Sequence, residues 1–440
     1  MQVVDVVYFI EHTARELDIA CAVKYLLLSK GINVEICSIV IDLDETLARW
    51  NPNVVVLPYG TNTRSANLER IIPHWGAACY VNLSFEQILG KAQKSFKAPK
   101  DRFARQHMLY TAWGEFFVDF LMEHGVAQQN ITLVGNPAFT LYTQPYRNYY
   151  GNLRAELAQK FKLSMDRRWV LIPENYGWAF FKDNNVRDRI QRGFDPQDAF
   201  QYRDFARDSL RASANWWREA AELDGIELIV RPRPAIPVEM FRDAVLEMAG
   251  EIPPHLHVIK YRTVREWILV SDLVFSSYST TLLDAAVADK PAYMLTPYSI
   301  PDFLYAEWYD VTAKVSTYDD FAAAVQAEPL EANWEALQNW VKTQMMSQGD
   351  AITNIANVIQ SIVHGEKLIP PPTEIAVALR KPSFDRFQRK VRHYGWEALQ
   401  SVLALTGKAT EKDWNPHERD LVDPTDVAQR VDRWADVLGR

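Results

Sequence analysis

Short apolar runs alternate with amphipathic stretches through the first third of the chain. The runs have the length of buried strands and lie at residues 3–10, 34–41, 54–57, 78–83 and 131–134. Apolar residues recur at helical spacing over 19–27, and aromatic residues predict a further helix over 103–120. Strands that alternate with helices predict a parallel sheet covered on both faces.

The same alternation returns after residue 150. Further strands are predicted at 169–172, 226–230, 257–259, 273–275 and 292–295, with helices at 206–223 and 264–270. The Tyr- and Asn-rich stretch 145–151 interrupts the pattern and is interpreted as a linker between a domain at 1–150 and a domain at 151–360. Two open α/β domains in tandem are expected to bind ligands in a crevice at the carboxyl ends of both sheets.

Beyond residue 360 the pattern changes. Three prolines at 370–372 precede a stretch, 384–405, whose apolar residues share one helical face while arginine and lysine lie elsewhere on the helix. Such a helix can lie on an anionic membrane surface or a protein partner, and packing on the protein's own domains explains it equally well. Residues 361–440 are therefore predicted to form a helical extension with a candidate peripheral membrane contact.

Composition narrows the choice of partners and compartment. The 440 residues carry 48 basic and 56 acidic side chains, a net charge of -8, so nucleic acid is not expected as a partner. Cys21, Cys37 and Cys79 lie in apolar segments without paired spacing, which is typical of buried thiols in a reducing compartment. Neither a signal peptide nor an apolar run long enough to cross a bilayer is found. We expect a cytoplasmic protein, attached at most to the inner face of the cytoplasmic membrane.

The segment with the most specific chemistry spans residues 274–286. An apolar strand runs into hydroxyl side chains that open a helix, where free N–H groups and the helix dipole favour a phosphate. Asp284 is placed to accept hydrogen bonds from a ribose, and Arg231 and Arg233 can neutralise phosphate charge. We interpret this segment as a nucleotide-sugar site, although a serine that only caps a helix gives the same local pattern. The hydroxyl residues assigned to the site are Ser276, Ser277, Ser279 and Thr280.

Six segments, each at or near a predicted strand end, give the chain a family resemblance over roughly residues 1–320. They are Glu11-His12 with Arg15-Glu16-Leu17, Asn82-Leu83-Ser84-Phe85-Glu86-Gln87, Val134-Gly135-Asn136-Pro137, Pro173-Glu174-Asn175-Tyr176-Gly177-Trp178, Arg231-Pro232-Arg233-Pro234, and 276–291. In these segments the chain resembles bacterial surface-polysaccharide biosynthesis proteins of GT-B glycosyltransferase architecture, which include capsule Kdo transferases and glycerophosphotransferases of teichoic acid synthesis. The resemblance implies two Rossmann-like domains whose parallel sheets face a central crevice. It also implies sugar transfer from a nucleotide-sugar donor, such as a CMP-linked Kdo-like sugar, to a surface polysaccharide or glycolipid.

Two positions depart from the family pattern. Related enzymes that use CMP-sugars or CDP-glycerol have a His-Pro pair on the donor phosphate where this chain has Arg233-Pro234. An arginine keeps the charge but cannot titrate, so a different donor is compatible with this site. The Glu of the family's ribose-binding helix is replaced by the shorter Asp284.

Sugar transfer requires stabilisation of the leaving phosphate and a base or nucleophile at the acceptor hydroxyl. The second domain is assigned the first task, and Glu174, directly after a predicted strand, is placed beside the sugar. Loops of the first domain are assigned the acceptor, and the turn at Gly135 and Asn136 is expected to approach the donor. No cluster of His and Cys residues indicates a metal, so we expect no metal ion or other cofactor. The predicted catalytic residues are Glu174, Glu86, His12 and Glu16.

Other interpretations stay open. Residues 39–47 resemble the first motif of haloacid-dehalogenase-type phosphatases, with Asp42 as nucleophile and Asp44 as acid and base, although both residues can instead end a strand and cap a short helix. A nucleotide-sugar epimerase shares the two-domain architecture but normally has a cluster of His and acidic residues in the second domain, which the sequence does not reveal. A non-catalytic binding protein is the third alternative, because a fold alone proves no activity.

Overall fold

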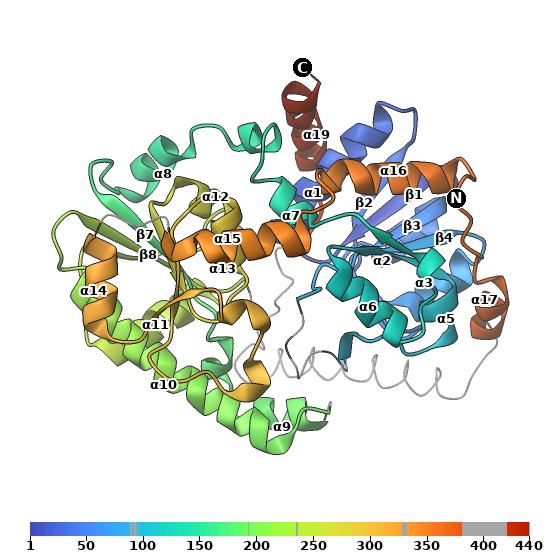
Figure 1. Ribbon diagram of the computed structural model, residues 1–440. Helices are drawn as coiled ribbons and strands as arrows, with labels where there is room; N and C mark the ends of the chain where they lie inside the picture. The colour runs from blue at the N-terminus through green and yellow to red at the C-terminus, as the bar shows by residue number, and fades with distance from the viewer. Residues whose placement is uncertain are drawn as a thin grey trace, which may run out of the picture.

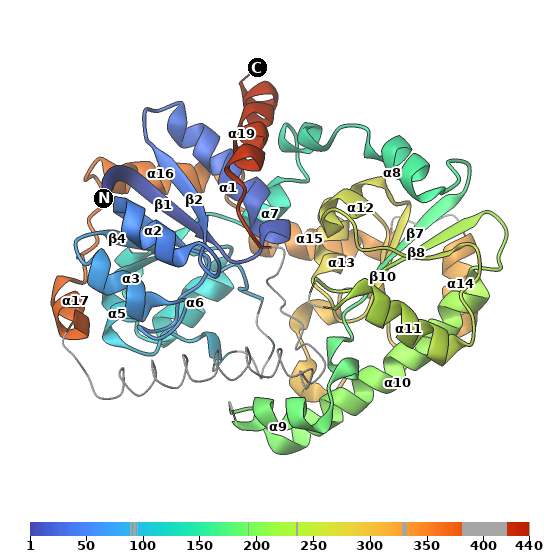
Figure 2. The same ribbon diagram turned by 180° about the vertical axis from the view of Figure 1, so that it is seen from behind.

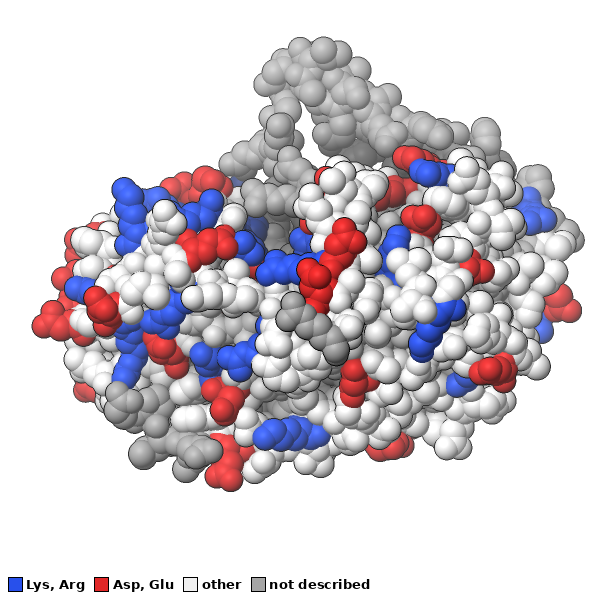
Figure 3. Space-filling model, turned by 90° about the horizontal axis from the view of Figure 1, so that it is seen from above, with Lys and Arg blue, Asp and Glu red and all other residues white. Residues whose placement is uncertain are grey.

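The computed structural model describes residues 1–88, 90, 94, 96–191, 193–234, 236–327, 332–380 and 420–439. It has two lobes, each built on a six-stranded parallel sheet that is covered by helices (Figure 1). The predicted α/β fold with two Rossmann-like units is therefore confirmed. Lys and Arg side chains lie interspersed with Asp and Glu over the face seen from above (Figure 3).

The first lobe contains the sheet β2-β1-β3-β4-β5-β6, in which every neighbouring pair is parallel. Its strands are β1 (Gln2–Ile10), β2 (Val34–Ser38), β3 (Trp50–Leu57), β4 (Cys79–Asn82), β5 (Met108–Ala112) and β6 (Ile131–Leu133). Its helices are α1 (Thr13–Leu28), α2 (Leu43–Arg49), α3 (Leu68–His74), α5 (Arg102–Gln106), α6 (Glu115–Glu123) and α7 (Pro137–Thr140). The carboxyl halves of the central strands β1 and β3 are apolar and buried, as expected of a sheet that helices cover on both faces.

The helix predicted over 103–120 is wrong, because strand β5 divides it into α5 and α6. All five residues of β5 are buried between β4 and β6, where both backbone edges find a partner strand. The aromatic side chains that gave the helical pattern, among them Phe103 and Phe117, pack from the two short helices into the same core. The prediction that these aromatic side chains are buried is therefore correct, but they belong to two short helices and not to one long helix.

The second lobe contains the sheet β12-β11-β10-β7-β8-β9, again parallel throughout. Its strands are β7 (Arg168–Pro173), β8 (Ile226–Arg231), β9 (Leu256–Val258), β10 (Leu273–Ser276), β11 (Ala292–Leu295) and the unpredicted β12 (Ala313–Val315). Its helices are α8 (Leu153–Phe161), α9 (Asp183–Gln191), α10 (Pro196–Ala220), α11 (Val238–Ala249), α12 (Val264–Val270), α13 (Thr281–Val287), α14 (Tyr318–Gln326) and α15 (Ala332–Met345). The strand order reverses between β7 and β10, which is where open α/β sheets bind ligands.

After α15 the chain returns to the first lobe. Helix α16 (Ala351–Val363) packs on α1, α17 (Thr373–Arg380) packs on α3, and α19 (Pro424–Leu438) packs on α1 from another side (Figures 1 and 2). The amphipathic stretch predicted at 384–405 lies outside the described residues. Within the described part of the chain, no helix combines the length and apolar character that crossing a membrane requires.

A buried ionic network joins the lobes beside α19. Asp18 on α1 accepts hydrogen bonds from Arg265 Nη1 of α12, at 3.2 Å, and from the Tyr150 hydroxyl of the inter-lobe segment, at 3.1 Å. Arg430 of α19 makes an ion pair with the other carboxylate oxygen of Asp18. Both Asp18 and Arg265 are buried, so the network fixes the second lobe against the first.

Candidate functional site

One candidate site lies at the carboxyl ends of β7 and β10, where the strand order of the second sheet reverses. Glu174 follows β7 directly, and Ser277 follows β10. Between them, the Ser276 hydroxyl donates a hydrogen bond to the Pro173 carbonyl and ties the two strand ends together. The predicted residues Glu174, Ser276 and Ser277 are thus on neighbouring strand ends.

Glu174 is the most unusual group of this site. Its side chain is 4% exposed, and neither carboxyl oxygen has a hydrogen-bond partner among the described residues. Burial raises the pKa of Glu174 to about 8, although the nearby Arg233 lowers it in part. The carboxyl is therefore mostly protonated at neutral pH and can donate a hydrogen bond to a bound group.

Arg233 lies over the turn that follows β7. A Cβ atom at Gly177 would be only 3.2 Å from Arg233 Nη1, so glycine at this position makes room for the guanidinium. The arginine is exposed and close enough to Glu174 to affect the pKa of that carboxyl. It places a positive charge at the mouth of the site, where an anionic ligand would meet it.

Aromatic side chains form one wall of this site. Tyr176 is buried beside Ser277 and close to Glu174, and burial raises its pKa. Trp178 stacks on Tyr202 of α10, with ring centroids 4.4 Å apart and planes at 19°. The Ser277 hydroxyl is buried and has no hydrogen-bond partner among the described residues, as is true of both Glu174 oxygens. Since Ser277 lies beside the Tyr176 hydroxyl, the Glu174 carboxyl is the group that most clearly indicates a place for a polar ligand.

The remaining donor residues of the second lobe have other contacts. Arg231 donates to the carbonyls of Tyr261 and Arg262, and burial lowers its pKa to about 10. Ser279 accepts a hydrogen bond from the Thr281 N–H at 3.3 Å, which is the local arrangement expected of a helix-starting serine, and Thr280 is exposed. The roles predicted for these residues on a donor stay predictions.

Asp284 lies on α13 toward the junction of the lobes. Burial raises the pKa of its carboxyl to about 6, while Arg265 and Tyr142 beside it favour the ionised form. One of these neighbours, Arg265, belongs to the network that joins the lobes, and the assignment of Asp284 to a ribose stays a prediction.

The first lobe holds a charged pocket at the carboxyl ends of β1, β3 and β4. Arg15 donates to Glu86 Oε1 at 3.1 Å and to Glu11 Oε2 at 3.3 Å, and Lys97 pairs with the other oxygen of Glu86. Although burial favours the neutral form, Lys97 and Arg15 lower the pKa of Glu86 to about 2. Tyr59 lines the same pocket. Glu86 is held as a carboxylate by these two cations and is therefore a weak base.

His12 and Glu16, both predicted as catalytic, lie beside this pocket with different surroundings. Glu16 is fully buried, with its oxygens occupied by Arg15, at 2.7 Å, and by the Glu11 N–H, at 2.7 Å. His12 Nδ1 lies 2.8 Å from Asp420 Oδ2, and Asp420 Oδ1 accepts from the Thr13 N–H. Burial alone would lower the pKa of His12, but the hydrogen bond with Asp420 raises it. Sequence reasoning missed Asp420, because 408 positions separate it from His12.

The turn at Gly135 and Asn136 lies where the chain crosses back between the lobes. Gly135 has φ +87°, and the Asn136 N–H donates to the Met345 carbonyl at 2.9 Å. The Asn136 side chain accepts from the Ala138 N–H and caps α7. These contacts give the turn a structural role at the crossing, and its approach to a donor stays a prediction.

The phosphatase-like motif contributes no residue to the lining of the first-lobe pocket. Asp42 follows β2, an edge strand, and its side chain accepts from the Ser38 N–H at 2.9 Å. Asp44 is exposed on α2 and pairs with Arg70. Asp42 thus occupies the N-cap position of α2, as the structural interpretation of this motif predicts, but its side chain does not cap the helix, and Asp44 lies within α2.

Comparison with known proteins shows which solved structures share the fold of this chain. No protein-family model matches the sequence, and a search of curated proteins also found no match. Among solved structures, the chain is similar to a Listeria monocytogenes protein assigned as a UDP-N-acetylglucosamine 2-epimerase, with 14% identity, TM-score 0.54 and coverage of 84% of this chain and 99% of that one.

Two further solved structures are similar to this chain over most of its length. The UDP-GlcNAc 2-epimerase of Neisseria meningitidis bound to UDP-GlcNAc has 12% identity, TM-score 0.50 and coverage of 82% and 100%. The wall teichoic acid polymerase TagF, in a structure soaked with CDPG, has 10% identity, TM-score 0.52 and coverage of 83% and 89%. These neighbours are GT-B enzymes, and the chain shares the GT-B architecture of two Rossmann-like domains. The capsule and Kdo part of the family resemblance gains no support from them.

Proposed function

We propose that the protein is a glycosyltransferase that takes a sugar from a nucleotide donor bound at Glu174 and Arg233. The observation that carries the proposal is the buried Glu174 carboxyl without a hydrogen-bond partner among the described residues, at the point where the second sheet reverses its strand order. A carboxylate at this place would repel a phosphate. A carboxyl with a pKa of about 8 is largely neutral and instead donates a hydrogen bond to a phosphate or sugar oxygen.

The acceptor binds in the first-lobe pocket in this proposal, with His12 as the base. Asp420 orients the His12 ring and raises its pKa, which makes the imidazole a stronger base. As the acceptor hydroxyl attacks the anomeric carbon, its proton passes to His12 and the bond between the sugar and the donor phosphate breaks. Arg233 stabilises the charge of the departing phosphate. Glu86, ionised between Arg15 and Lys97, orients the acceptor hydroxyl groups.

The donor is proposed as a nucleotide-linked sugar and the acceptor as a surface glycan or glycolipid at the inner face of the membrane. The Neisseria meningitidis epimerase structure is bound to UDP-GlcNAc and the TagF structure was soaked with CDPG, and the family resemblance adds CMP-linked sugars. Arginine and the hydroxyl of Ser277 provide phosphate contacts without a metal ion in this proposal.

Thermal shift with CMP, CDP, UDP, GDP and dTDP tests the donor site. A nucleotide that binds only the native state raises the unfolding midpoint, and the concentration dependence gives its affinity. We expect Arg233→Ala to weaken that affinity about ten- to hundredfold, because it removes a charge-assisted hydrogen bond. Arg242→Ala, which removes an exposed arginine elsewhere on the lobe, is the matched control and should leave the affinity unchanged. No stabilisation by any of the five nucleotides in the wild type would overturn the proposal.

A UDP-sugar epimerase is the second candidate, because solved neighbours assigned as such epimerases share this fold. The two activities differ in what they need. An epimerase converts the nucleotide-sugar alone to its C2 epimer, whereas a transferase leaves the sugar configuration at C2 unchanged and needs an acceptor. Incubation of the protein with UDP-GlcNAc and no acceptor, followed by NMR of the sugar protons, separates them: a new C2 epimer assigns the epimerase.

A further inference from the structure

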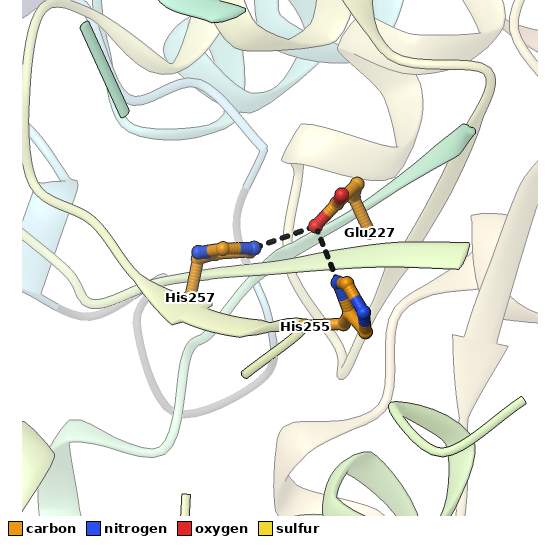
Figure 4. A group of neighbouring side chains, drawn as sticks. All are labelled: Glu227, His255 and His257. Atoms are coloured by element: carbon orange, nitrogen blue, oxygen red, sulfur yellow. Dashed lines mark hydrogen bonds and ion pairs between the residues drawn. The ribbon is translucent and has the colours of Figure 1, made fainter. Parts of the chain in front are cut away.

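A second cluster of chemically active side chains lies at the amino ends of the strands of the second sheet, whereas Glu174 lies at their carboxyl ends. Glu227 lies at the amino end of β8, and His255 and His257 lie at the amino end of the neighbouring edge strand β9. Both imidazoles point to the Glu227 carboxylate (Figure 4). The cluster combines two imidazoles and one carboxylate, a ligand set common in sites for divalent transition metals.

The geometry of the three ligand atoms fits one small ion. His257 Nε2 lies 2.7 Å and His255 Nδ1 lies 3.3 Å from Glu227 Oε2, and all three atoms lie within 4.8 Å of one another. Ligands about 2.0–2.1 Å from a tetrahedral zinc ion are about 3.3 Å apart. Only small side-chain rotations are therefore needed to place the three atoms around a common centre.

The surroundings of the carboxylate direct one of its oxygens to the imidazoles. The Ser164 N–H donates to Oε1 at 3.1 Å, and the Arg167 guanidinium lies 4.0 Å from that same oxygen. Both histidines are on the Oε2 side. Such contacts to the second oxygen hold a metal-binding carboxylate in place. Glu227 is buried, while the His255 side chain is 37% exposed, so an ion can reach the site from solvent.

We propose that Glu227, His255 and His257 bind one divalent transition-metal ion of the Zn²⁺ class, with water completing the coordination. The ion would join the edge strand β9 to β8 at the end of the sheet remote from the nucleotide crevice. Its role is structural, and the proposal is independent of the activity proposed for Glu174. This proposal departs from the sequence prediction of no metal ion, because that prediction considered only the spacing of His and Cys residues along the chain.

Titration of the chelator-treated full-length protein with Zn²⁺ by calorimetry, and with Co²⁺ by visible absorption, tests this site. We expect one high-affinity ion that is lost, or bound more than about tenfold more weakly, in His255→Gln and in His257→Gln. His364→Gln, an exposed histidine after α16, is the matched control and should bind as the wild type does. Affinity should also fall at acid pH, because protons compete for the ligand atoms.

Stability provides a second measurement that does not depend on any enzymatic activity. Zn²⁺ should raise the unfolding midpoint of the wild type and of His364→Gln but not that of His255→Gln. His255 is partly exposed at a strand end, so its replacement is compatible with a folded protein, and equal midpoints of the metal-free proteins verify this. Equal binding by the wild type and both cluster variants would assign the cluster to hydrogen bonding alone and overturn the proposal.

Discussion

At the residue scale, the surroundings of three carboxyl groups give them very different pKa values. Burial without a hydrogen-bond partner raises the pKa of Glu174 to about 8. Burial raises the pKa of Asp284 to about 6, with Arg265 opposing it, while Lys97 and Arg15 outweigh burial and lower that of Glu86 to about 2. Sequence reasoning found all three residues. Their protonation states follow from tertiary contacts that local sequence does not contain.

Glu174 should make the stability of the protein fall as pH rises from about 5 to about 8. Its pKa is about 8 in the folded state against an ordinary value of 4.5, so over this window the folded state binds more protons than the unfolded state. The stabilisation is complete below pH 4.5 and is lost, at up to about 1.4 kcal/mol per pH unit, until the folded pKa is passed. Urea unfolding at several pH values should therefore show a shallower decline in Glu174→Gln than in the wild type.

A second carboxyl variant provides the control for this pH dependence. Glu86 has a pKa of about 2 in the folded state and is ionised over the whole window, so Glu86→Gln should keep the wild-type slope. Coincident slopes for the wild type and Glu174→Gln would mean that Glu174 is already ionised at pH 5.

At the scale of elements, the hydrophobic pattern predicted most of both sheets and failed at two strands whose residues do not form an isolated apolar run. Ten of the twelve strands match predicted apolar runs, and the missed strands are β5 and β12. β12 has the exposed Lys314 between Ala313 and Val315, so no apolar run marks it, and β5 is surrounded by aromatic residues that repeat at helical spacing. The Glu227 cluster was missed for a related reason, since only the pairing of β8 with β9 brings its members together.

Helix α19 packs on α1 of the first lobe, and the hydrophobic pattern did not predict this contact. Its largest buried side chain there is Trp434. Trp434 is fully buried, stacks on Tyr149 with centroids 4.0 Å apart, and donates to the Asp18 carbonyl at 3.1 Å. We expect Trp434→Ala to lower the free energy of unfolding by about 3–5 kcal/mol, because it leaves a cavity against α1.

Urea denaturation followed by far-UV circular dichroism measures this cost. Leu421→Ala is the control from the same segment: its side chain is 60% exposed, and its removal should change stability by less than about 0.5 kcal/mol. A similar small change for Trp434→Ala would show that α19 contributes little to the stability of the first lobe.

At the scale of the whole molecule, the two lobes are connected by chain crossings and by charge. The chain passes to the second lobe through the buried tyrosines of 146–150 and returns after α15, where Asn136 bonds to Met345. Asp18, Arg265 and Arg430 then connect α1, α12 and α19, elements from both lobes. The relative position of the proposed donor and acceptor sites consequently depends on a few buried polar contacts as well as on apolar packing.

The Asp18–Arg265 pair is expected to couple the stability of the two lobes. Both side chains are buried, so Arg265→Ala leaves the Asp18 charge short of a partner and should lower the free energy of unfolding by about 3 kcal/mol. Arg102→Ala removes an arginine that is 61% exposed and pairs with the exposed Glu374 within one lobe. Its effect in the same urea titration should stay below about 1 kcal/mol.

A double-mutant cycle separates this ion pair from the packing of the arginine stem. Asp18→Ala and Arg265→Ala each remove one partner of a buried charge, whereas the double variant removes both charges of this pair together and leaves Arg430 to Asp426. The double variant should therefore lose less stability than the sum of the single variants, by about 1 kcal/mol or more. Strictly additive losses would mean that the two groups stabilise their lobes independently, and the lobes would then be positioned by the chain crossings and apolar contacts alone.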